Sequence, residues 1–276
     1  MVVGAPTPAG FRTRPKADRY AKALKLVRFD LKAEPGSPRA GMLHNGRIYE
    51  SEHGQAVAVH EAAEVRPLSP VERPPSIRLF ATGSRDEADD PLRFVYANPA
   101  AIVGPSQLIP LPDAFGPYSV RTYLGAVLTD SPREIDEEDA DKVILGYTMV
   151  AAVALEYPAR ERFGAALDFG IAVGPALITP DELADVFDAG GYDLAATLRV
   201  EGVEKTTRSL LPLFPTISAA VASAARTAPL RAGDLIAIGP LFDPALTPVE
   251  AGDEVALAIE RLGTLAVKLT SPEEEY

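Results

Sequence analysis

Short apolar runs separated by proline and glycine dominate the hydropathy pattern of this chain. Such runs, rich in β-branched and aromatic side chains and bounded by turn residues, are typical of strands. We expect strands at 24–28, 77–81, 123–128, 195–200, 234–239 and 255–263. A turn-rich stretch is expected at 34–39. Further along, Asn45-Gly46 between apolar pairs predicts a hairpin, because both residues tolerate positive φ.

Helical spacing is found in fewer places. The longest segment covers 137–152, where apolar side chains recur at i, i+3, i+4 and i+7, namely Ala140, Val143, Ile144 and Tyr147. Acidic residues at its start suit the positive end of a helix dipole. Thr179 followed by Pro180 predicts a short helix, and an Ala/Ser/Val-rich segment at 216–225 predicts another. We therefore expect a mostly β fold with some α.

Length and composition suggest one large domain with a small appendage. The chain has 276 residues, of which 47% are hydrophobic and 24% charged, enough for a sizeable core. Residues 1–23 are basic and poor in apolar side chains, which predicts a flexible arm. Residues 24–74 predict a small strand-rich domain that ends in a proline-rich crossing. Residues 75–276 then form the main domain.

Charge and cysteine content exclude several classes of function. The net charge is −12, and no sustained basic run suggests nucleic-acid binding. No apolar run is long enough for a membrane span and no signal-peptide core is visible, so we expect no membrane association. The absence of cysteine excludes disulfides and thiolate nucleophiles and fits a cytoplasmic location.

Several segments, in this order and at this spacing, resemble the fumarylacetoacetate hydrolase (FAH) family. They are AIVGP at 101–105, TYLGAVLTD at 122–130, GYTMVAAVA at 146–154, ALDFGIAVGPALITPDEL at 166–183, LRAGDLIAIG at 230–239 and VEAGDEVALAIERLGTL at 249–265. The resemblance covers residues 24–269. It implies an FAH-like mixed β-roll or sandwich main domain with a small strand-rich N-terminal domain. It also implies assembly as a homodimer.

The resemblance implies a metal site whose ligands this chain lacks. The family usually holds a divalent metal with two carboxylates from an E-x-E on a strand and one from an Asp after a G-Y-T-type segment. The E-x-E frame here reads Arg121-Thr122-Tyr123, and the Asp position reads Ala152. Magnesium and calcium prefer carboxylate and carbonyl oxygens. We therefore expect no metal, no other cofactor, and a reaction different from the family's usual one.

The strand around Arg121 can also be interpreted without any family. Alternation along a strand places Arg121 and Tyr123 on one face and an apolar set on the other. A guanidinium and a phenol on a pocket wall could bind a carboxylate or enolate directly. The alternative is a structural ion pair with an aromatic filler, in which the partner of Arg121 would be Asp168 or Glu156.

Further candidates come from the family frame. Glu87 falls at the position of the family's catalytic His, in a charged segment with Ser84 and Arg85. Buried, Glu87 could act as a general base; otherwise the segment is a solvated loop. Tyr96 stands where a family lysine is expected, and Ala165 replaces a second one. Asp168 is retained in an apolar stretch, so we expect it to be buried and hydrogen-bonded, either in the pocket or to backbone amides of its own loop.

The sequence thus leaves two functions open. The first is a metal-independent FAH-like enzyme, an isomerase, lyase or cyclase acting on a keto–enol or oxo-acid metabolite, as in specialised-metabolite biosynthesis. Arg121, Tyr123, Asp168 and Glu87 would be catalytic, and Ser84, Arg85, Tyr96 and Glu156 would bind the substrate. The second is a non-catalytic relative that binds a metabolite or partners an active paralogue. An intact pocket with a buried Arg121 favours the first, and a pocket filled by side chains favours the second.

Overall fold

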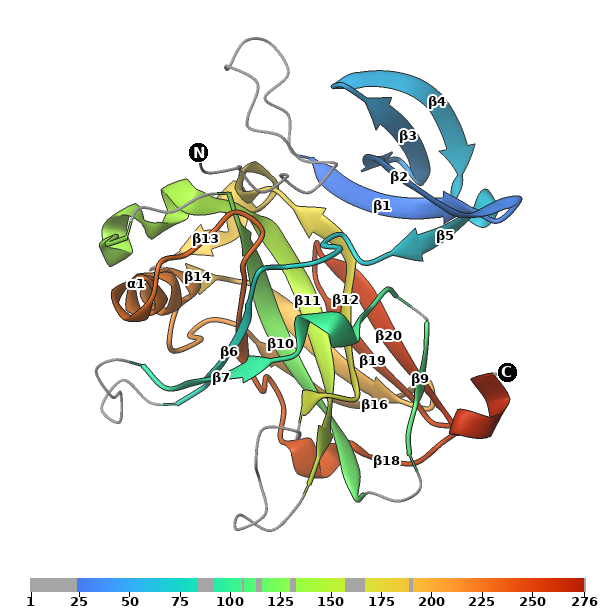
Figure 1. The fold of residues 1–276 in the computed structure, drawn as a ribbon. Coiled ribbons are helices and arrows are strands. Elements are labelled where there is room, and N and C mark those ends of the chain that lie inside the picture. Colours follow the sequence, from blue (N-terminus) through green and yellow to red (C-terminus); the bar gives the residue numbers. More distant parts are fainter. Residues whose placement is uncertain are drawn as a thin grey trace, which may run out of the picture.

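The computed structural model describes residues 24–83, 92–105, 107–112, 116–129, 133–156, 167–188 and 191–275. The predicted N-terminal arm, 1–23, lies outside these ranges. The predicted mostly β fold is confirmed, since strands make up most of the described chain (Figure 1).

One large sheet runs through the whole molecule. Its 13 strands include a continuous path of neighbours in the order β4 (Gln55–Glu61), β3 (Arg47–Glu52), β2 (Glu34–His44), β1 (Lys25–Leu31), β12 (Gly170–Ile178), β11 (Ile144–Leu155), β10 (Tyr118–Leu128), β17 (Leu235–Gly239), β6 (Ile77–Ala81) and β7 (Phe94–Ala97). Off this path, β5 (Val65–Leu68) pairs with β1, β8 (Ile102–Val103) with β12, and β18 (Pro248–Val249) with β10.

Smaller sheets and short helices complete the fold. A five-stranded sheet has the order β16 (Val203–Ser209), β15 (Ala195–Val200), β19 (Glu254–Ile259), β20 (Gly263–Thr270) and β9 (Leu108–Pro110), and β13 (Phe187–Asp188) pairs with β14 (Gly191–Tyr192). Within the described residues, the helices are α1 (Ile217–Thr227) and the 3₁₀ turns η1 (Ala62–Glu64), η3 (Pro99–Ala101), η4 (Glu137–Val143), η6 (Pro180–Val186), η7 (Pro244–Leu246) and η8 (Pro272–Glu275).

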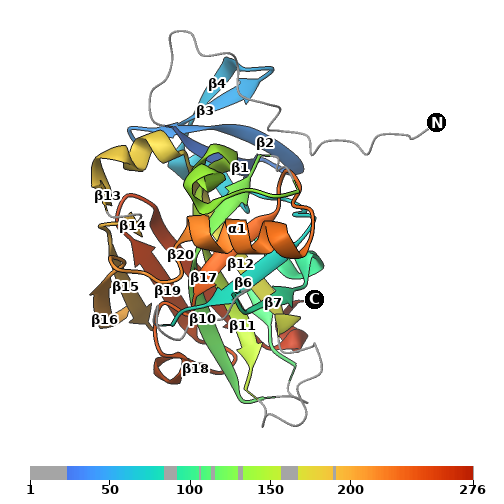
Figure 2. The same cartoon turned by 90° about the vertical axis from the view of Figure 1, so that its left-hand side faces the viewer.

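The main core lies on what we call the inner face of the large sheet. Alternate residues of β10, such as Val120, Leu124 and Leu128, pack there with residues of β15, β19, β20 and α1. Figure 2 shows α1 lying across this part of the molecule, where it contacts β17. The outer face carries a second, smaller apolar cluster, which includes Tyr123, Ala152 and Ile171. The central strands are therefore buried on both faces.

The N-terminal strands continue the large sheet rather than standing apart. They gather at one end of the molecule in Figure 1. Lys25 and Leu26 of β1 are in register with Ile178 and Leu177 of β12. The predicted hairpin joins β2 and β3, with φ of 49° at Asn45 and 77° at Gly46. The division of the chain at residues 74 and 75 stays a prediction.

Some predicted elements are wrong. Residues 137–152 form η4 followed by β11, because an apolar stretch buried on both faces fits a strand as well as a helix. The segment 255–263 is a hairpin between β19 and β20, with Arg261 at φ 66°. Residues 34–39, predicted as turns, belong to β2.

Other helix predictions are confirmed. The short helix after Thr179 is η6, with Pro180 in its first turn. Thr216 caps α1 by accepting a hydrogen bond from the Ala219 N–H at 3.0 Å. Among the described residues, no helix is long and apolar enough to cross a membrane.

Candidate functional site

Two neighbouring strands bring the family-aligned positions together on the outer face. In the antiparallel register of β10 and β11, Arg121 lies directly opposite Ala152, and Tyr123 lies opposite Val150. Tyr123 and Ala152 belong to the outer apolar cluster, whereas the alternate residues Val120 and Leu124 belong to the main core. The prediction that Arg121 and Tyr123 share one face is confirmed.

Arg121 forms an ion pair with Glu156, which follows the end of β11. Arg121 Nη2 and Nε donate to Glu156 Oε1 at 2.6 and 3.1 Å. Ser119 Oγ donates to the same oxygen at 2.7 Å. The two charged side chains are 26% and 29% exposed, so the pair lies at the rim of the outer face. Of the two partners expected for a structural pair, Glu156 is the one observed.

Tyr123 lies beneath this rim. The side chain is only 3% exposed, and its hydroxyl is hydrogen-bonded to Arg121. Burial raises the pKa of Tyr123 to about 12, because the charged phenolate loses its hydration; the nearby positive charge of Arg121 opposes this shift only in part. Tyr123 is therefore a neutral phenol throughout the physiological pH range.

The centre of the outer face is filled by side chains. Ala152 is fully buried, and the residues packed around it and Tyr123 are apolar, including Leu79, Ala97 and Leu167. The Tyr123 ring also rests on the backbone of β17: a Cβ at Gly239 would lie 2.5 Å from Tyr123 Cδ1. Glycine at 239 is thus needed for this ring position. By the criterion set from the sequence, this filling favours the non-catalytic alternative.

Tyr96 does not join this group. Its cross-strand neighbours form one row: Arg78 on β6, Ile236 on β17 and Ala126 on β10. Residues in such a row share a face of the sheet, and Ile236 and Ala126 belong to the main core on the inner face. The expectation that Tyr96 faces the pocket is therefore wrong. The neighbouring Ala97 is the residue of β7 that reaches the outer cluster. A shift of one residue along a strand moves a side chain to the opposite face.

Of the remaining candidates, only Asp168 lies within the described residues. Asp168 is exposed, so the prediction that it is buried in an apolar setting is wrong. Its apolar sequence neighbours pack inward while the Asp itself points to solvent, with Leu167 buried beside it. Ser84, Arg85 and Glu87 lie outside the described residues, as does Ala165.

Comparison with known families finds one match, which covers most of the chain. The sequence model of the fumarylacetoacetate hydrolase C-terminal region matches residues 76–270. The chain belongs to the fumarylacetoacetate hydrolase family. The match contains β10, β11 and β12, and therefore the whole outer-face site described above.

Several curated relatives are named as enzymes. A 2,4-didehydro-3-deoxy-L-rhamnonate hydrolase of Sphingomonas sp. strain SKA58 is 28% identical over 188 residues, 63% of this chain and 63% of the relative. A mitochondrial oxaloacetate tautomerase of Xenopus laevis is 27% identical over 60% of this chain and 54% of the relative. The chain thus spans less than two thirds of the length of these relatives.

Solved structures show the same fold. A 2-hydroxyhepta-2,4-diene-1,7-dioate isomerase from Mycobacterium marinum superimposes with a TM-score of 0.75 at 23% identity, over 90% of this chain and 99% of the other. A maleylpyruvate hydrolase from Sphingobium sp. SYK-6 gives 0.71 at 21% identity, with the same coverage. These likenesses confirm the predicted FAH-like fold.

The residues at the positions expected to match the family's metal ligands are not ones that bind a divalent metal. A guanidinium, a buried neutral phenol and a methyl group stand at 121, 123 and 152, and the carboxylate of Glu156 already binds Arg121. Over the described ranges, no group of three or more His, Cys, Asp or Glu side chains is placed to hold a metal ion. A metal ion also requires oxygen or imidazole donors that the Arg121 side chain cannot supply.

Sequence reasoning missed Ser119 as a member of the site. Its signal was available, because Ser119 shares the alternation of Arg121 and Tyr123 along the strand. What the pattern could not show was its hydrogen bond to Glu156, a residue that is 37 positions away in the chain.

Proposed function

We propose that this chain is a metal-independent FAH-family enzyme that binds a keto–enol or oxo-acid metabolite at the Arg121–Glu156 rim and isomerises it. The observation that carries this proposal is that Arg121, at a strand position where the family is expected to hold a metal carboxylate, is paired with the carboxylate of Glu156. The relatives support the substrate class, since they are named for reactions on oxaloacetate and maleylpyruvate.

The rim contains the groups that such a reaction needs. A substrate carboxylate can replace Glu156 as the partner of Arg121, because a guanidinium binds two oxygens of a carboxylate side by side. The released Glu156 can then take a proton from the carbon next to the oxo group and return it to another atom of the enolate. Arg121 offsets the negative charge that develops. Tyr123, protonated and hydrogen-bonded to Arg121, holds the guanidinium in place.

Isomerisation is the simplest reaction for this site, because it moves protons without water or a redox partner. Decarboxylation or cyclisation of the same substrate class would use the same charge stabilisation, together with orientation of the substrate. Metal-assisted hydrolysis has no ligand set at these positions. Elemental analysis of protein purified without chelator should therefore find no stoichiometric divalent metal; about one magnesium, calcium or manganese per chain would contradict the proposal.

A second candidate is a non-catalytic family member that binds a metabolite or partners an active paralogue. The buried state of Tyr123 and Ala152 in the outer apolar cluster favours it, since little of the ancestral polar surface is left to contact a substrate. We also propose that the chain assembles as a homodimer, as the family resemblance implies. Light scattering that gave a stable monomer at micromolar concentration would refute the dimer.

Arg121→Ala tests the site, with Arg47→Ala as the matched control. Arg47 is also ion-paired, with Glu61 at 2.9 Å, but it is 58% exposed and lies on β3. Binding and turnover of oxaloacetate, maleylpyruvate and related oxo acids would be measured by calorimetry and by ultraviolet absorption of the enol. Loss of a charged hydrogen bond to the ligand should weaken binding by roughly 2–5 kcal/mol in Arg121→Ala only.

The outcomes separate the two candidates. Turnover by the wild type that Arg121→Ala abolishes supports the enzyme. Binding without turnover, again lost in Arg121→Ala, supports the non-catalytic member. A folded Arg121→Ala variant that behaves like the wild type in both assays contradicts a ligand role for this rim.

A further inference from the structure

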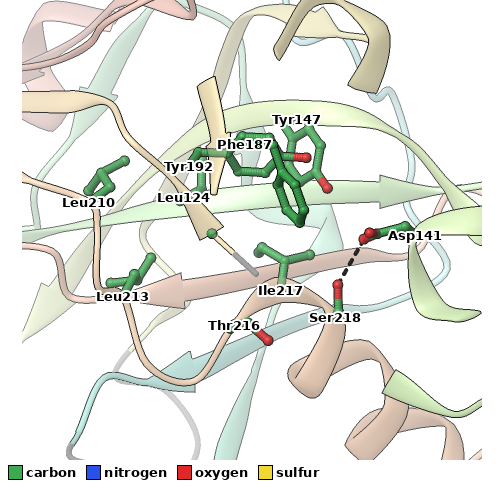
Figure 3. A pocket seen from close by; sticks show the side chains of 11 residues that line it. Leu124, Asp141, Tyr147, Phe187, Tyr192, Leu210, Leu213, Thr216, Ile217 and Ser218 are labelled. Atoms are coloured by element: carbon green, nitrogen blue, oxygen red, sulfur yellow. Dashed lines mark hydrogen bonds between the residues drawn. The ribbon is translucent and has the colours of Figure 1, made fainter. Parts of the chain in front are cut away.

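A small hollow lies on the inner side of the large sheet, away from the Arg121 rim. It has a volume of about 20 Å³, which is space for one or two water-sized groups. Its wall combines aromatic side chains with a carboxylate, as Figure 3 shows for Tyr147, Phe187, Tyr192 and Asp141. The first residues of α1, Ile217 and Ser218, close it on another side.

The aromatic wall is a connected group of three rings. Tyr192 stands edge-on to Tyr147, with ring centroids 4.9 Å apart, and edge-on to Phe187, with centroids 5.2 Å apart. Tyr147 is buried, whereas Phe187 is 44% exposed and keeps part of its ring open to solvent. Aromatic faces carry partial negative charge, so such a wall attracts cations.

The carboxylate at the hollow, that of Asp141, is negative like the aromatic faces. Asp141 Oδ1 accepts a hydrogen bond from Ser218 Oγ at 2.8 Å. The adjacent Lys142 is paired with Asp139 and does not neutralise Asp141. Glu137, a second carboxylate on η4, accepts from Thr216 Oγ1 at 3.0 Å. Two carboxylates therefore face the start of α1, whose dipole amounts to only about half a positive charge.

The two tyrosines stay neutral in this surrounding. Burial raises the pKa of both phenols, to about 12 for Tyr192, and the negative charge of Asp141 raises both further. The two phenols lie close to each other, with ring centroids 4.9 Å apart. The hollow thus offers ring surface, a neutral hydroxyl pair and one carboxylate, with apolar side chains such as Leu213 at its side.

We propose that this hollow binds a small alkylammonium ion. The carboxylate of Asp141 would accept from the ammonium group, the rings of Phe187 and Tyr192 would stabilise its charge, and Leu213 and Ile217 would contact the alkyl part. The volume limits the ligand to a head group of about the size of methylammonium. This binding is independent of the function proposed for the Arg121 rim.

Backbone amide NMR shifts can test the proposal with methylammonium chloride as the probe. Saturable shifts are expected at residues 191, 192, 217 and 218, over and above those caused by sodium chloride at equal ionic strength. Methanol is the neutral control of similar shape. Asp141→Asn and Phe187→Leu should each weaken methylammonium binding by roughly two- to fivefold. Glu138→Gln, an exposed carboxylate change on the same 3₁₀ turn, should leave it unchanged.

Several results would overturn the proposal. Equal shifts with methanol would mean that the hollow selects for apolar shape and not for charge. Unchanged binding in both Asp141→Asn and Phe187→Leu, or no saturable shift at these amides, would mean that no cation site exists there. Because Asp141 also faces the start of α1, thermal unfolding of each variant checks that the helix is intact. Phe187→Leu, at a half-exposed position, keeps the test valid if Asp141→Asn proves unstable.

Discussion

The inner and outer faces of the large sheet are built by the same strands but bury different chemistry. On the inner face, β10 and β11 contribute a mostly apolar set that packs on a second sheet and on α1. On the outer face, the centre is apolar and small, while the rim carries Ser119, Arg121 and Glu156. Alternation along a strand lets one face specify the fold while the other changes its chemistry.

This comparison predicts that the inner face dominates stability. Leu128, at the end of β10, is 1% exposed and belongs to the main core. Leu128→Ala should lower the free energy of unfolding by roughly 2–5 kcal/mol, because it removes buried apolar volume and leaves a cavity. Val95→Ala on β7, where Val95 is 54% exposed, is the control and should change it by less than about 0.5 kcal/mol.

Urea unfolding followed by far-UV circular dichroism would measure both variants. Equal midpoints for Leu128→Ala and Val95→Ala would contradict the assignment of the main core to the inner face. The size of the loss within the expected range reports how well the neighbouring residues of the second sheet can close the cavity.

The strands that build the core are the part that sequence reasoning describes best. Short apolar runs located β6, β15 and β17 closely, because a buried strand needs a short run of apolar side chains bounded by turn residues. The same reasoning failed at 137–152, where an apolar strand buried on both faces also satisfies a helical spacing. Burial on both faces removes the alternation that would have distinguished the two structures.

The outer face was predicted only in part. The shared face of Arg121 and Tyr123 follows from local alternation, and the register across β10 and β11 agrees with it. The positions of Tyr96 and Asp168 did not follow, because each depends on where a short segment enters the sheet and on a one-residue phase. The hydrogen bond between Ser119 and Glu156 joins residues 37 positions apart in the chain and has no local signal.

A second prediction concerns the outer face, where the buried phenol of Tyr123 should make stability depend on pH. The folded-state pKa of Tyr123 is raised to about 12, above the unfolded value of about 10. The folded state therefore holds this proton more tightly, and the associated stability is fully present below about pH 10. It is lost as the pH rises through the folded pKa, by an amount on the order of 2–3 kcal/mol.

Tyr123→Phe isolates this effect, because the other tyrosines titrate in both proteins. At neutral pH the variant should be less stable than the wild type by about 1 kcal/mol, since it loses the hydrogen bond to Arg121. Chemical unfolding between pH 8 and pH 11 would be compared for both, at values chosen around the unfolded pKa of about 10. The wild type should lose its advantage as the pH rises; parallel curves would mean that Tyr123 is accessible to water.

The smallest expected effect is the coupling between Arg121 and Glu156 at the rim of the outer face. Its size determines whether Arg121 can exchange its partner for a ligand. A double-mutant cycle with Arg121→Ala, Glu156→Ala and the double variant isolates the coupling between the two side chains. Because both are about a quarter exposed, the coupling in the free energy of unfolding should be about 1 kcal/mol. The exposed pair Arg47–Glu61, in which both side chains are 58% exposed, is the comparison and should give a smaller coupling.

A coupling near 1 kcal/mol would let Arg121 exchange Glu156 for a ligand carboxylate at little cost, as the proposed function requires. A coupling of roughly 3 kcal/mol or more, the range of buried pairs, would fix the pair as part of the structure and favour the non-catalytic member.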